Sequence, residues 1–166
     1  MKTKISVAAA VFLFPVLVST AGPGPAYPQE KAERPTYYAK NVVFENQVGN
    51  AAEALGKPDG RYAEIKPGGT LILFLEAKIY PSGILDDGMV VCKEEGNYGL
   101  AGWLPTEVTD QGPQYAWVLL VRGRSPSSFR LTTLVPGEGS AGIDMIRITN
   151  DDSKSIFVDA LVGYGR

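Results

Sequence analysis

The chain has 166 residues, of which 45% are apolar, with 16 basic and 18 acidic side chains and no histidine. This length fits one domain, and the mild acidity argues against nucleic acid or an anionic membrane surface as the main partner. The lack of histidine excludes Ser-His-Asp and Cys-His catalytic sites and an imidazole general base.

Residues 1–21 have the pattern of a secretory signal peptide. Lys2 and Lys4 precede an apolar run from Ile5 to Val18, and small residues lead to Ala21. The run is shorter than the roughly 20 residues of a membrane-spanning helix, which favours cleavage after Ala21, with Ala26 as second choice, over a retained anchor. We therefore expect a secreted or periplasmic protein, not inserted in the membrane after cleavage, with 14 basic and 18 acidic residues once Lys2 and Lys4 are removed.

The rest of the chain divides into a tether and one domain. Residues 22–35 are rich in proline, glycine and charge, which is typical of a flexible segment, and residues 36–166 form the predicted domain. Cys92 is the single cysteine, so an intrachain disulfide is excluded. Its apolar neighbours favour a small buried residue over a reactive thiol.

Short apolar segments separated by Gly, Pro, Asn and Asp predict strands. The expected strands are 42–44, 61–65, 70–76, 88–93, 115–121, 128–134, 143–149 and 156–162. Residues 50–55 are expected to form one helical turn or an irregular loop. Pro67-Gly68-Gly69 is expected to be a turn, 96–105 a glycine-rich loop and 136–142 a further loop. This pattern, with its uneven loop lengths, predicts an all-β antiparallel β-sandwich, jelly-roll-like, rather than a closed barrel.

Four segments carry a resemblance to a known type of domain. They are 54–60 (ALGKPDG), 68–74 (GGTLILF), 143–150 (IDMIRITN) and 157–162 (FVDALV). Their succession resembles exported bacterial cell-surface domains of the galactose-binding-like jelly-roll type, over most of the chain after residue 35. The resemblance implies a sandwich that binds a ligand at the cell surface.

The same resemblance implies a structural calcium ion, because such domains often bind one through an early loop and a late acidic residue. It implies Asp59 and Asp159 as metal ligands, with Asn50 or the carbonyl of Lys57 as helpers. Calcium takes six to eight oxygen ligands, many of them carboxylates and loop carbonyls. The alternative is that Asp59 closes an Asx-turn with its own backbone and that Asp159 pairs with Arg147 or a neighbouring amide.

Aromatic residues are the candidates for contact with a glycan, since sugar sites combine aromatic platforms with hydrogen-bonding groups. Tyr98 and Trp103 are the predicted ligand-binding residues, because a loop can expose a ring that a scaffold holds. For Trp103 the alternative is a plug over one end of the sandwich. Tyr115 and Trp117 lie two residues apart on one strand face and are expected to pack in the core.

Adjacent acidic residues occur at Asp86-Asp87, Glu94-Glu95 and Asp151-Asp152. Neighbouring strand residues face opposite ways, so no pair supplies by itself the two carboxyls, about 5 to 10 Å apart, that a glycosidase needs. We expect these pairs to be solvated turn charges. Arg122 and Arg124 could hold a carboxylate or be ordinary exposed turn charges.

Together these features favour an exported, non-catalytic β-sandwich module that binds a glycan or another cell-surface component. A structural or assembly protein of the cell envelope without a small ligand is the alternative. An enzyme, such as a lyase, is the least favoured possibility because histidine and a suitable carboxylate geometry are missing.

Overall fold

The computed structural model describes residues 34–82, 85–94, 96–124, 127–131 and 142–165. The predicted signal peptide, nearly all of the predicted tether and most of the predicted 136–142 loop lie outside these ranges. The elements are β1 (Thr36–Gly49), the 3-10 turn η1 (Ala51–Ala54), β2 (Ala63–Ile79), β3 (Gly88–Cys92), β4 (Asn97–Thr109), β5 (Gly112–Arg124), β6 (Ser127–Phe129), β7 (Ile143–Asn150) and β8 (Ile156–Tyr164). Within the described ranges there is no helix with the length and apolarity of a membrane span.

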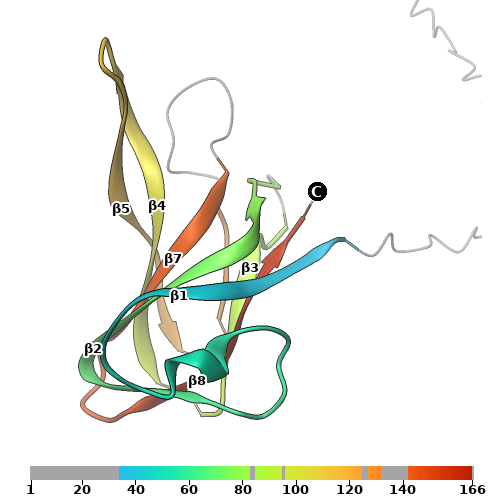
Figure 1. Cartoon of the computed structure of the whole chain (residues 1–166), viewed down its shortest axis with the longest axis vertical. Helices are drawn as coiled ribbons and strands as arrows, with labels where there is room; N and C mark the ends of the chain where they lie inside the picture. Colours follow the sequence, from blue (N-terminus) through green and yellow to red (C-terminus); the bar gives the residue numbers. More distant parts are fainter. Residues whose placement is uncertain (1–33, 83–84, 95, 125–126, 132–141, 166) are drawn as a thin grey trace, which may run out of the picture. The chain divides into compact units, whose positions relative to one another are not determined.

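The eight strands pair in a nested order, the first with the last. β1 pairs with β8, β2 with β7, β3 with β6 and β4 with β5, all antiparallel. Further ladders join β8 to β3 and β7 to β4, which gives two four-stranded groups, β1-β8-β3-β6 and β2-β7-β4-β5. This is the arrangement of a jelly roll, so the predicted all-β, antiparallel, jelly-roll-like sandwich is confirmed (Figure 1).

The curled sheet bends at Pro67-Gly68-Gly69, where a turn between two strands was predicted. That prediction is wrong, because β2 runs through this segment as one strand. Before the bend, residues 63–65 pair with β8, and after it residues 70–74 pair with β7. Gly68 has φ of 70°, and a Cβ on Gly69 would lie 2.7 Å from the carbonyl oxygen of Lys66. Glycine at both positions therefore lets a single strand serve both groups.

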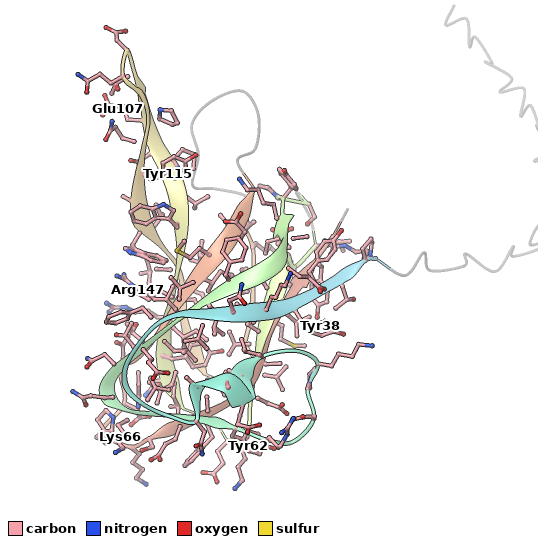
Figure 2. The ribbon with its side chains drawn as sticks, in the orientation of Figure 1. Tyr38, Tyr62, Lys66, Glu107, Tyr115 and Arg147 are labelled. Carbon is pink, nitrogen blue, oxygen red and sulfur yellow. The ribbon has the colours of Figure 1, made fainter. Side chains whose placement is uncertain are left out.

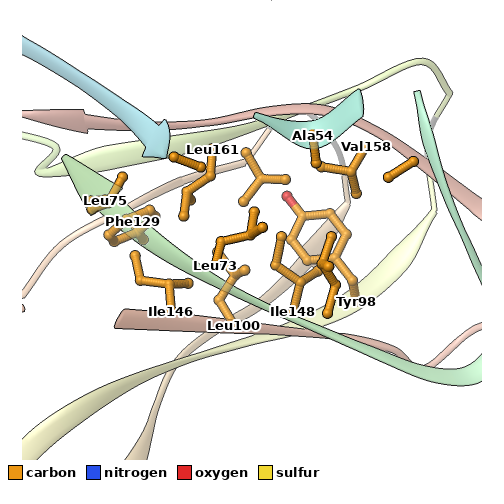
Figure 3. Packing of buried hydrophobic residues seen from close by; sticks show 14 of the residues in the cluster. Ala54, Leu73, Leu75, Tyr98, Leu100, Phe129, Ile146, Ile148, Val158 and Leu161 are labelled. Carbon is orange, nitrogen blue, oxygen red and sulfur yellow. The ribbon is translucent and has the colours of Figure 1, made fainter. Parts of the chain in front are cut away.

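The core lies between the two groups and follows the alternation of the strands. Leu71, Leu73 and Leu75 of β2 are fully buried, and the side chains between them are partly exposed. Each such leucine contributes about 1.5–3 kcal/mol by leaving water. Other members, several of them shown in Figure 3, are Ile65, Tyr98, Leu100, Ile146, Ile148, Val158 and Leu161. Cys92, predicted to be a small buried residue, packs against this cluster and is half-buried.

The glycine-rich segment at 96–105 is a strand, contrary to the prediction of a loop. A Cβ on Gly99 would lie 2.8 Å from the Thr149 hydroxyl oxygen, and one on Gly102 would lie 3.1 Å from a methyl carbon of Ile143. These glycines therefore mark close packing between strands. β7 pairs with β4 only as far as Gly102, and the hairpin of β4 and β5 continues past this point, as Figure 1 shows.

Candidate functional site

The group β5-β4-β7-β2, extended by β1, has one face in the core and one outer face. Directly paired residues of neighbouring antiparallel strands lie on the same face, so the register identifies the outer row. This row, read from β5 to β1, is Leu119, Ala101, Arg147, Ile72 and Phe44. Leu119 and Phe44 at its two ends are 51% and 50% exposed. An apolar row therefore crosses the whole outer face, with one arginine at its centre.

A second outer row, next to the first, carries aromatic side chains. Trp117 of β5 pairs with Trp103 of β4, and Met145 of β7 pairs with Phe74 of β2. All four are partly exposed. We call the two rows together with Tyr115 the outer face. Exposed apolar surface of this extent is typical of an interaction site.

Three aromatic rings make contact on this face. The rings of Trp103 and Tyr115 are nearly parallel, with centroids 6.2 Å apart and 12° between their planes. The ring of Trp117 is tilted by 60° to Trp103 at 5.2 Å. The guanidinium carbon of Arg147 lies 4.9 Å from the centroid of Trp117. Figure 2 labels Tyr115 and Arg147 along the same side of the domain.

The structure separates the two predicted ligand-binding residues. Trp103 lies on the outer face and is partly exposed, as a platform requires, although it stands on a strand and not on a loop. Tyr98 lies in the core with 1% of its surface exposed, so its ring does not face a surface ligand (Figure 3).

Tyr115 and Trp117 were predicted to pack in the core, and this is wrong. Tyr115 is 47% exposed, and Val118, on the other face of β5, packs against the core instead. The pattern of β5 does contain a signal for this outcome, because both of its faces are apolar and the aromatic side chains all lie on one of them. A strand with two apolar faces is either buried on both sides or presents one to a partner.

The structure brings together Asp59 and Asp159, the predicted calcium ligands, although they are a hundred residues apart in sequence. The carboxylate of Asp159, 6% exposed, accepts the backbone N–H groups of Asp59 at 3.0 Å and Gly60 at 3.2 Å. The Asp59 carboxylate accepts the backbone N–H of Arg61 at 3.0 Å and its guanidinium at 2.7 and 2.9 Å. The Arg61 side chain, more than its backbone N–H, lowers the pKa of Asp59.

This is the hydrogen-bonded alternative, an Asx-turn and a carboxylate that binds amides. Asn50, the proposed helper, lies at the start of η1, where its carbonyl accepts the N–H of Glu53 at 2.9 Å. In the described ranges no three acidic or cysteine side chains gather as they would around a metal ion. A calcium ion here would have to displace the Arg61 side chain from the Asp59 carboxylate. Calcium binding remains a prediction.

Asp87 is fully buried, which corrects the expectation that the adjacent acidic residues are solvated. Its two oxygens accept the backbone N–H groups of Ser82 and Leu131, both at 2.7 Å. Arg34 approaches the same carboxylate at 4.0 Å. Asp86, the neighbour, is exposed and receives a hydrogen bond from the Arg130 side chain at 3.2 Å. Asp87 therefore connects two loops and has a structural role.

Comparison with known proteins found no protein-family profile that matches the chain and no curated protein of similar sequence. Function is therefore inferred from the outer face itself. It offers aromatic rings for stacking, one cationic group, and polar side chains at its border, among them Asn41, Asn46, Thr70 and Thr149.

Proposed function

We propose that the protein is an exported, non-catalytic binding module that holds a glycan of a cell surface on its outer face. The observation that carries the proposal is the cluster of Trp103, Tyr115 and Trp117, three aromatic rings in contact on a partly exposed sheet face. Sugar rings stack on such platforms through their apolar C–H faces, while neighbouring amides and hydroxyls bind their hydroxyl groups. Asn41 and Thr149 are side chains of this kind at the border of the face.

The assignment to the galactose-binding-like type is part of this proposal. It is supported by the jelly-roll pairing of the strands together with the four sequence segments that carry the resemblance. Export is supported by the pattern of residues 1–21. A non-catalytic role is supported by the absence of histidine from the sequence. It is also supported by the backbone N–H groups that bind the carboxylates of Asp87 and Asp159.

The test is a glycan array followed by titration calorimetry on the glycans retained. Trp103→Ala should weaken binding at least about tenfold, since truncating an aromatic anchor typically costs 2 kcal/mol or more. Tyr115→Ala should also weaken it, and this half-exposed residue can be changed with little risk to folding. Tyr62→Ala is the matched control, because Figure 2 labels Tyr62 at the opposite end of the domain from Tyr115. The proposal would be contradicted if Trp103→Ala and Tyr115→Ala both kept the affinity of the unchanged protein, or if they lowered it no more than Tyr62→Ala does.

A second function, in envelope assembly, is favoured by the position of β5. This strand stands at one end of the sheet order, so its outer edge has no strand partner among the described residues. Unpaired edges with exposed apolar side chains are templates for pairing with another chain. Sedimentation velocity distinguishes the two functions: a dimer that Leu119→Lys dissociates, with no glycan bound, favours assembly over glycan binding.

A further inference from the structure

We infer that the ligand of the outer face carries a carboxylate, as a uronic acid does, and that Arg147 is the residue that recognises it. This inference rests on the proposed glycan-binding function and specifies its ligand class. The starting observation is that Arg147 stands at the centre of the apolar row and has no acidic partner among the residues that the structure describes.

The surroundings of Arg147 can be read from the register of the sheet. Its direct neighbours are Ala101 on β4 and Ile72 on β2, both apolar. Along β7, the next side chains on the same face are Met145 and Thr149, both uncharged. No neighbouring position therefore supplies a negative charge.

Three acidic residues lie near the border of the face. Glu76, on the same face of β2 as Phe74, accepts the backbone N–H of Tyr38 at 3.1 Å, and the other two already have cationic partners. Asp144 lies 3.9 Å from the ammonium group of Lys78, and Asp151 lies 3.9 Å from Nε of Arg122. Among the described residues, Arg147 has neither a hydrogen bond nor an ion pair, and its Nε is covered without a partner. The central cation of the face is thus the one left without a counter-charge in this part of the chain.

The guanidinium of Arg147 makes no hydrogen bond with a described residue, and of its nitrogens only Nε is fully covered, so the terminal N–H groups keep their donors for a ligand. The guanidinium carbon lies 4.9 Å from the centroid of the Trp117 ring, within the range of a cation–π contact. The N–H donors lie in the guanidinium plane and point sideways, where the fork of an arginine matches the two oxygens of a carboxylate. Trp117 also fixes the position of the group, which reduces the side-chain freedom lost on binding.

A ligand can therefore make two contacts within one or two row spacings of the sheet. Its sugar ring stacks on Trp103 or Tyr115, and its carboxylate reaches Arg147 beside Trp117. Because apolar side chains lower the effective dielectric constant around Arg147, this charge pairing is stronger than at an open surface. If Arg147 only covered the ring of Trp117 with its stem, the face would not distinguish acidic from neutral sugars.

The test uses uronate oligosaccharides and their methyl esters, which differ in charge and hardly in shape, alongside a panel of neutral glycans. We expect the acid form to bind at least about tenfold tighter than the ester, with an advantage that shrinks as salt is raised. Arg147→Gln should abolish the preference, and Arg147→Lys should retain part of it. Arg130→Gln is the matched control, since that arginine lies beside Asp86, outside the strands of the outer face, and should leave the preference unchanged.

The outcomes separate this inference from the function on which it rests. Equal binding of acid and ester, or a preference that persists in Arg147→Gln, overturns the carboxylate assignment while glycan binding stands. No binding to any acidic or neutral member of the panel overturns both. If Arg147→Gln binds the acid only as tightly as the ester, with an unchanged melting temperature, both the carboxylate assignment and glycan binding are supported.

Discussion

Replacement of Asp87 by asparagine should destabilise the protein strongly, although the change is nearly isosteric. The carboxylate is fully buried and accepts two backbone N–H groups at 2.7 Å. Asparagine keeps one acceptor oxygen and places an NH2 donor against the other N–H. Hydrogen bonds to a charged group contribute about 1.5–3 kcal/mol, and a buried donor without a partner costs a similar amount. We therefore expect the free energy of unfolding to fall by about 2–4 kcal/mol, a large part of the 5–15 kcal/mol typical of a domain.

Urea denaturation followed by tryptophan fluorescence measures this loss. Asp86→Asn is the matched control, since it makes the same chemical change one residue away on an exposed side chain paired with Arg130. Exposed ion pairs contribute at most about 1 kcal/mol, so the two variants should differ clearly. If Asp87→Asn and Asp86→Asn were equally stable, the assignment of Asp87 as the connection between two loops would be refuted.

Three further outcomes are expected. The hydroxyl of Ser128, then the guanidinium of Arg130, lowers the pKa of Asp86 below its ordinary value of 3.8. The stabilising effect of the charged Asp86 carboxylate is therefore complete above about pH 5 and is lost as the pH falls through the lowered pKa. Urea midpoints measured between pH 6 and 2 should depend less on pH in Asp86→Asn than in the unchanged protein. An identical pH dependence in the two proteins would contradict this. Asp159→Ala should cost about 2 kcal/mol by freeing two N–H groups and should speed amide exchange at Gly60, and unchanged exchange there would refute the loop contact. If calcium binds at the Asp59 loop, chelator should lower the melting temperature and Asp59→Ala should remove that effect, whereas superimposable melting curves would exclude a tightly coupled site.

The local pattern was sufficient to predict most strands and the class of fold. Alternation in β7 placed Arg147 opposite Ile146 and Ile148, and the apolar run at 71–75 identified the central core strand, as the burial of these side chains confirms. The contact between Asp59 and Asp159 was also anticipated, but from a family resemblance. Nothing in the spacing of the two residues indicates that they meet.

The errors have a common physical cause, which is that distant partners decide what a local pattern means. Glycine at 99 and 102 is typical of a loop, yet in the strand a Cβ at these positions would lie 2.8 Å from the Thr149 hydroxyl oxygen and 3.1 Å from a methyl carbon of Ile143. The burial of Asp87 depends on Leu131, 44 residues away. The outer position of Trp117 depends on which face of β5 turns to the core. Because both faces of this strand are apolar, the local sequence does not tell which one is buried.

The nested pairing of the strands has a consequence for how the chain folds. Thr36 at the start of β1 pairs with Tyr164 at the end of β8, whereas β4 and β5 are joined by a tight hairpin. Hairpins close in microseconds, but contacts between distant segments form slowly because a long loop must first be closed. Folding should therefore proceed from the hairpin outward, with β1 and β8 docking last. A chain synthesised from its N-terminus therefore keeps β1 without one of its partners until β8 has also been made.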